Sequence, residues 1–122
     1  MNLRTLVMVA GLLAAPAALA HAPKVGDHGG LQVDAGPYHL ELVMKNTALE
    51  VFLVDHTGKQ VTTDGFKGTA ILLVDGKPQR IPLAPAGDNR LTGTAPAPLP
   101  AEPKGTVQIT TSNGSTVQGR FN

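Results

Sequence analysis

The chain alternates short β-prone runs with residues that form turns, and this pattern constrains its fold more than any other feature. No window repeats its apolar residues at the three-to-four-residue period of an amphipathic helix. Turns are predicted where Gly, Asn, Asp or Pro tolerate a positive φ or preset a turn: Ala35-Gly36-Pro37, Thr57-Gly58, Asp75-Gly76, Gly87-Asp88-Asn89 and Ser112-Asn113-Gly114-Ser115.

Strands are predicted between these turns. They span residues 31–33, 38–45, 49–54, 69–74, 79–83, 90–94, 106–111 and 116–121. This spacing predicts an all-β fold, a single antiparallel β-sandwich or small barrel of about seven to eight short strands. Residues 95–104 contain four prolines. Because proline cannot donate to a β-ladder, this segment is predicted to be an extended strap from one sheet to the other.

Residues 1–20 have the three parts of a secretory signal peptide. Arg4 gives a basic start, residues 6–13 form an apolar run, and Ala18-Leu19-Ala20 supplies the small residues that precede a cleavage site. The apolar run is too short to span a membrane. We therefore predict a signal helix at 1–20 that is cleaved after Ala20, a flexible N-terminal arm at 21–30 and a β-sandwich domain at 31–122. The mature protein is expected to be periplasmic, with no membrane span.

The composition argues against several classes of function. The sequence has 10 Lys and Arg and 9 Asp and Glu, and the loss of Arg4 with the leader leaves nine of each, so no net charge favours nucleic-acid binding. Without cysteine there is no disulfide, thiolate site or cysteine nucleophile. Met44 is the single methionine after residue 20, which excludes a methionine-rich copper site. Few aromatic residues and no nucleophile motif predict that the protein is not an enzyme.

All four histidines lie within residues 21–56, and they are the candidate metal ligands: His21, His28, His39 and His56. After cleavage His21 would offer both its α-amino nitrogen and a ring nitrogen to one ion. The pair Gly29-Gly30 would let the arm fold back, because glycine removes the steric limit on a turn. Such nitrogen donors favour copper as Cu(II), with zinc next. The alternative for each histidine is an ordinary surface or hydrogen-bonded role.

Two registers of the hairpin formed by residues 38–45 and 49–54 bring His39 and His56 together. A four-residue loop sets them directly opposite, with β-carbons about 5 Å apart. A two-residue loop at Asn46-Thr47 makes them diagonal neighbours about 7 Å apart, whereas a three-residue loop separates them. Glu41 on the same face, and Asp55 beside His56, are candidates to orient an imidazole or to act as oxygen ligands.

The chain also resembles a known type of small β domain. The resemblance rests on His28-Gly29-Gly30, on residues 34–43 (DAGPYHLELV) and on residues 51–61 (VFLVDHTGKQV), and it covers about 26–93. Similar domains occur in periplasmic adaptor subunits of heavy-metal efflux pumps and as small exported proteins. The resemblance implies a periplasmic all-β domain in metal resistance. The start His21-Ala22-Pro23 is also similar to that of small periplasmic copper carriers of β-sandwich fold, whose remaining sequence differs.

Two functions are therefore expected, in order. The first is a periplasmic metal-binding protein, with Cu(II) ahead of Zn(II), which acts as a carrier or buffer in metal homeostasis or resistance. The second is a non-catalytic accessory module that docks on efflux-pump components or another envelope complex through an exposed strand edge and binds no metal.

Overall fold

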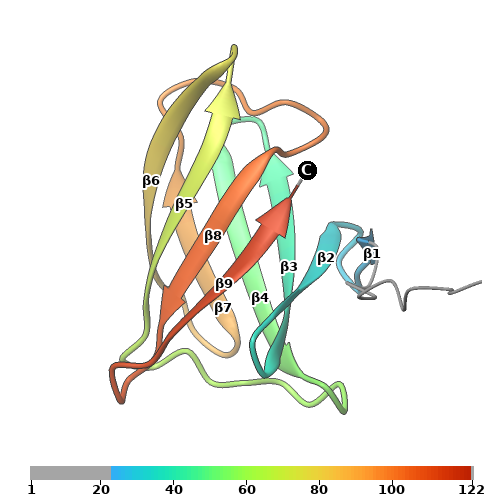
Figure 1. The fold of residues 1–122 in the computed structure, drawn as a ribbon, viewed down its shortest axis with the longest axis vertical. Coiled ribbons are helices and arrows are strands. Elements are labelled where there is room, and N and C mark those ends of the chain that lie inside the picture. Colours follow the sequence, from blue (N-terminus) through green and yellow to red (C-terminus); the bar gives the residue numbers. More distant parts are fainter. Residues whose placement is uncertain (1–22, 122) are drawn as a thin grey trace, which may run out of the picture.

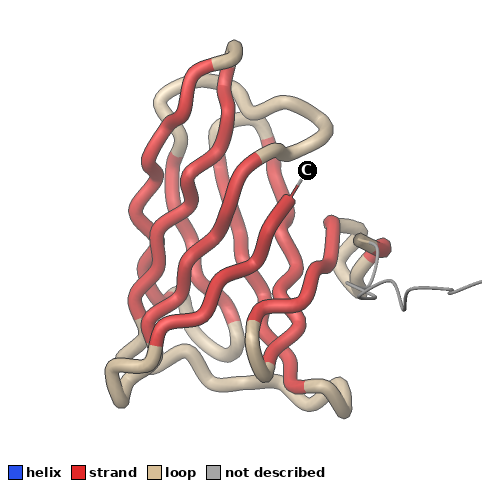
Figure 2. Tube along the Cα trace, viewed as in Figure 1, coloured by secondary structure: helices blue, strands red, loops and turns tan. Residues whose placement is uncertain are grey.

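The computed structural model describes residues 23–121, and this part of the chain consists of β-strands and loops (Figures 1 and 2). The strands are β1 (Lys24–Val25), β2 (Leu31–Ala35), β3 (Tyr38–Lys45), β4 (Ala48–Asp55), β5 (Lys67–Val74), β6 (Lys77–Pro85), β7 (Arg90–Thr94), β8 (Gly105–Thr110) and β9 (Thr116–Phe121). The all-β prediction is confirmed here, and each of the eight predicted strands forms within two residues of its expected bounds. The predicted signal helix at 1–20 lies outside the described residues.

The expected strand number is one too low, because β1 forms inside the segment 21–30 that was predicted to be a flexible arm. Two residues, Lys24 and Val25, pair with Gln32 and Leu31 of β2. So short a strand gives no period-2 pattern that the sequence could reveal. Within residues 23–121 no helix has the length and apolar character needed to cross a membrane.

The strands form one antiparallel sheet in the order β1-β2-β3-β4-β7-β6-β5-β8-β9. The sheet curls into a half-barrel, which brings β9 back toward β2 (Figure 1). Gly119 of β9 packs so closely there that a Cβ added to it would lie 2.9 Å from Val33 Cγ2 of β2. The edges of β2 and β9 are not hydrogen-bonded to each other. The fold is thus neither two separate sheets nor a closed barrel.

Strand β6 carries the sheet from one layer to the other. Its residues 77–83 pair with β5, and only Ala84 and Pro85 pair with β7. Ala84 lies opposite Thr92, and the Ala86 amide donates to the Arg90 carbonyl. Amide groups alternate between the two edges of a strand, so even-numbered residues here face β7. The N–H groups that Pro78 and Pro82 lack would point to the side where residues 77–83 form no ladder pair. A strand tolerates proline at such positions, because no ladder hydrogen bond is lost.

The concave side of the sheet encloses the core. Its fully buried side chains include Leu40, Leu42, Leu49, Val51, Leu53, Leu72, Ile81, Leu91, Val107, Ile109 and Phe121. On β3 the alternate residues Tyr38, Leu40, Leu42 and Met44 all pack on this core. The opposite face of β3 is also partly covered, because Glu41 is only 4% exposed. Residues 26–30 lie over this face. A Cβ added to Gly26 would meet the Glu41 side chain, and one added to Gly30 would meet Leu42 and Val43.

The proline-rich segment 95–104 connects β7 to β8, which belong to different parts of the curled sheet. It forms no strand. The Leu99 amide donates to the Asn46 carbonyl at 2.9 Å, and the Leu73 amide donates to the Lys104 carbonyl at 2.9 Å. Residues 95–104 thus form the predicted extended strap, but it joins two parts of one curled sheet and not two sheets. The Leu99 bond holds its middle and the Lys104 bond holds its end.

Candidate metal centre

The β3–β4 hairpin has the two-residue turn that was one of the two registers expected. Lys45 pairs with Ala48, and Asn46 takes a positive φ of 58°, a conformation that Asn adopts more readily than most residues. His39 consequently lies opposite Val54, and His56 follows the last residue of β4. The two imidazoles are diagonal neighbours, and the four-residue loop does not form.

This register brings the two imidazole rings into direct contact. His39 Nε2 lies 3.0 Å from His56 Nδ1, and the rings meet edge to face with centroids 4.6 Å apart. The pair is at the surface, near the turn between β2 and β3. From that turn the Gly36 carbonyl lies 3.2 Å from His56 Nε2. Two nitrogen donors, from residues 17 positions apart, thus converge on one small region.

Asp34 is the third member of the cluster, and the sequence did not point to it. Its Oδ1 lies 2.9 Å from His39 Nδ1, on the side of the ring away from His56. Asp34 is on β2, directly opposite His39 on β3. The predicted strand stopped at residue 33, since Asp is uncommon in strands. Extending it by two residues to the Gly36-Pro37 turn would have placed Asp34 beside His39.

The hydrogen-bond roles in the cluster follow from what each group can accept or donate. The Gly36 carbonyl only accepts, so His56 Nε2 donates to it. The Asp34 carboxylate accepts from His39 Nδ1. One proton lies between His56 Nδ1 and His39 Nε2. A metal ion that took the lone pairs of His39 Nε2 and His56 Nδ1 would displace the proton between them.

Asp55 has a different role from the two expected for it, because its carboxylate is used within its own loop. Asp55 Oδ1 accepts hydrogen bonds from the Thr57 hydroxyl at 2.6 Å, the Thr57 amide at 2.9 Å and the Lys59 amide at 2.9 Å. The Thr57 hydroxyl first, and the Lys59 amide next, hold the pKa of Asp55 below its usual value. These bonds close the loop that presents His56.

His28 lies apart from the pair, although it was predicted as a ligand together with the other histidines. Its Nδ1 lies 2.8 Å from Glu41 Oε1, and its ring stacks on Phe52 at a centroid distance of 3.6 Å. The amides of His28 and Gly30 also donate to the Glu41 carboxylate. Glu41 therefore does orient an imidazole, as one expectation had it, but the ring is that of His28. The Glu41–His28 contact anchors the arm to β3.

His21, the remaining predicted ligand, lies outside the described residues. The direction from which the chain enters is visible, since Lys24 lies opposite Gln32 and β1 is antiparallel to β2. The N-terminal end of β1 therefore points toward the part of β2 that holds Asp34.

No family model, curated protein or solved structure matches this chain. The resemblance to efflux adaptor domains and to copper carriers thus remains an expectation from the sequence.

Within residues 23–121, the group Asp34, His39 and His56 has the composition and spacing of a metal site. One potential ligand atom from each lies within 4.8 Å of the others. His39 is mostly buried and Asp34 is half exposed, with side-chain exposures of 15% and 37%. A carboxylate bound to the second nitrogen of a histidine fixes the orientation of that ring and raises its basicity. The cluster fits two imidazole ligands with Asp34 behind one of them, or as a third ligand if it turns.

Proposed function

We propose that the protein binds a divalent transition metal through His39 and His56 and acts in the periplasm as a carrier or buffer. The observation that carries this proposal is the pair of imidazole nitrogens 3.0 Å apart with a carboxylate on the outer nitrogen of His39. Zn–N bonds are about 2.0–2.1 Å long, so two ligand nitrogens at this separation can share one ion after a small ring rotation.

Cu(II) is the favoured ion and Zn(II) is second, because first-row divalent ions bind nitrogen sites in that order. The cluster is exposed and supplies fewer ligands than a closed structural site needs. In the mature protein the α-amino and imidazole nitrogens of His21 would complete it, since β1 enters the fold from the side of Asp34. An open site of this kind suits uptake and release, and the expected setting is metal resistance.

Calorimetric titration of the mature protein, residues 21–122, with Cu(II) and with Zn(II) tests the proposal. We expect His39→Gln and His56→Gln each to weaken binding by about ten-fold or more, since even changes to groups behind the ligands have effects of that size. His28→Gln is the control for loss of an imidazole outside the pair, and it should bind metal more tightly than either of these two variants. Absence of binding by the unaltered protein, or unchanged binding after both substitutions at once, would contradict the proposal.

The contribution of His21 has its own test, a protein with one alanine added before that residue. The addition moves the α-amino group off the histidine and removes the terminal chelate without altering the β domain. Weaker Cu(II) binding assigns His21 to the site. Equal binding removes His21 and leaves the His39–His56 pair.

A further inference from the structure

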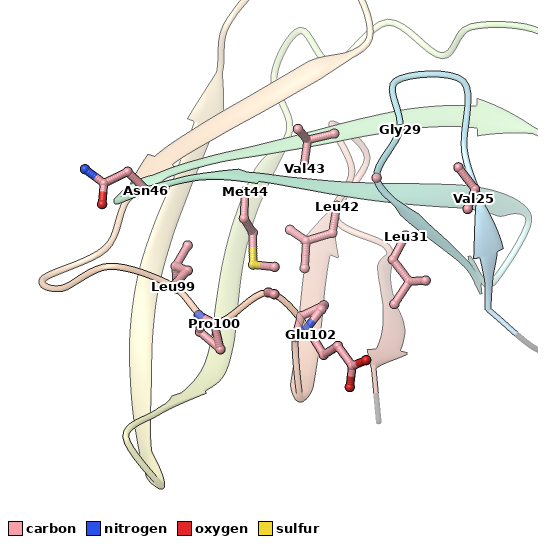
Figure 3. Close-up of a pocket in the computed structure, with 13 residues that line it drawn as sticks. Val25, Gly29, Leu31, Leu42, Val43, Met44, Asn46, Leu99, Pro100 and Glu102 are labelled. Carbon is pink, nitrogen blue, oxygen red and sulfur yellow. The ribbon is translucent and has the colours of Figure 1, made fainter.

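A cavity of about 330 Å3 lies between the strap and the strands β1 to β3 (Figure 3). Val25, Leu31 and Met44 lie on one side of it, and the strap contributes Leu99 and Glu102 on the other. Leu42, the lining residue of β3 that is nearest His39 in the sequence, lies three residues from it, which is about 10 Å along a strand, and on the opposite face. The cavity is therefore separate from the candidate metal centre, and it is large enough for a small organic molecule.

The lining is mostly apolar but carries one charged side chain, and this combination limits which ligands can bind. Apolar side chains dominate it, and Figure 3 shows those of Leu31, Leu42 and Met44 directed from β2 and β3 toward the strap. Among the described residues that line it, Glu102 is the one charged side chain and none is cationic. A negative charge beside an apolar wall attracts a positive group and repels an anion. The lining thus distinguishes amphiphiles by the sign of their head group.

Val25 shows that part of this apolar surface is left uncovered. It is 77% exposed, and the other large exposed apolar side chain within residues 23–121, Leu73, is 38% exposed and lies outside the cavity. Burial of apolar area stabilises by about 25 cal/mol per Å2. A ligand that covers Val25 while it fills the cavity gains this contribution.

Both walls are held in place before any ligand arrives. The strap is fixed by the bonds from Leu99 to Asn46 and from Leu73 to Lys104. The arm is fixed by the Glu41 carboxylate, which accepts from the amides of His28 and Gly30. A preformed cavity avoids the cost of ordering its walls on binding.

We propose that this cavity binds a small amphiphilic cation, with its apolar chain between β3 and the strap and its ammonium group beside Glu102. The proposal is independent of the metal function, because it shares no side chain with the metal cluster. The volume limits the occupant to a single chain with a compact head group, so a folded partner does not fit.

Binding of three probes with the same alkyl chain tests the proposal: decylammonium, decyl sulfate and decanol, each below its micelle-forming concentration. Two-dimensional NMR of the labelled mature protein gives both the affinity and the location of the shifts. We expect decylammonium to bind most tightly and decyl sulfate least tightly, with shifts centred on Met44, Leu99 and Glu102. Equal binding of cation and anion, or shifts centred elsewhere, would overturn it.

Surface variants separate the two parts of the interaction without removing core side chains. Glu102→Gln should weaken decylammonium binding by about two- to five-fold, the range of an exposed ion pair, and should leave decanol unaffected. Ala101→Trp should fill the cavity and abolish binding of all three probes. Asp64→Asn is the control for loss of a negative charge outside the cavity. Val25→Ser should weaken binding of the probes, whereas Leu73→Ser, its control outside the cavity, should not. If Ala101→Trp binds decylammonium normally, the cavity is not the site.

Discussion

Three carboxylates lie near the histidines, and each accepts hydrogen bonds from different donors. Those donors decide what each acidic residue does in the structure. Asp34 faces the ring of His39 across a strand pair. Glu41, two residues further along β3, is covered by the arm and accepts from its amides. Asp55 bends back on its own loop. Only Asp34 acts on a ring of the His39–His56 pair, which is why it belongs to the proposed metal centre.

Asp34→Asn should weaken metal binding by about 10–100-fold, the effect typical of losing a carboxylate that orients a metal-bound histidine. The amide is nearly the same size but carries no charge, so it accepts a weaker hydrogen bond from His39 Nδ1 and orients that ring less firmly. Titration calorimetry measures the change, and thermal unfolding checks that the fold persists. Asp27→Asn in the arm is the control. Unchanged affinity in the Asp34 variant would show that this carboxylate has no part in the site.

The pKa of Asp55 predicts a local response to acid at the loop that presents His56. Its folded-state pKa is lowered, so the ionised form is the one that holds the loop closed. The contribution is present above the unfolded pKa of about 3.9 and is lost as the pH falls through the lower folded value. The amide signals of Thr57 and Lys59 should therefore shift together in this acidic range in NMR spectra. Asp55→Asn should show no such transition, and a transition that persists in it would assign the change to another group.

At the scale of elements, the turns and strands could be predicted from the sequence, because each turn and strand depends on residues that are close together in the chain. Asn46 adopts the positive φ that the two-residue turn needs, and the eight strands follow the alternation of their own residues. The position of His28 could not be predicted in this way. It depends on Glu41, 13 residues away, and on Phe52 in another strand. Asp34 was missed for a local reason, since β2 continues past the residue at which its β-prone run ends.

The arm is the element whose position rests most on one side chain. Glu41 is buried and accepts from the amides of His28 and Gly30 and from the His28 ring. Glu41→Ala should destabilise the protein by about 1.5–3 kcal/mol, the contribution typical of a hydrogen bond to a charged group, as measured by urea unfolding. Hydrogen exchange at residues 24–30 should quicken more than in β5 or β8. Val43→Ala, on the same face, is the control for lost packing alone, and equal exchange in both variants would count against the anchoring role.

At the scale of the whole molecule, a half-barrel has free strand edges, and a free edge can pair with another chain. Residues 77–83 of β6 form no ladder pair with β7, and Pro78 and Pro82 remove two donors from that side. Replacing both with valine, a residue of high β-propensity, would restore the N–H groups. We expect the double variant to self-associate at concentrations where the unaltered protein is monomeric, with its strand content preserved. Light scattering across a concentration series measures this, and Pro98→Val in the strap is the control because that residue lies in no strand. A double variant that scatters like the unaltered protein would mean that the curl of the sheet alone protects this edge.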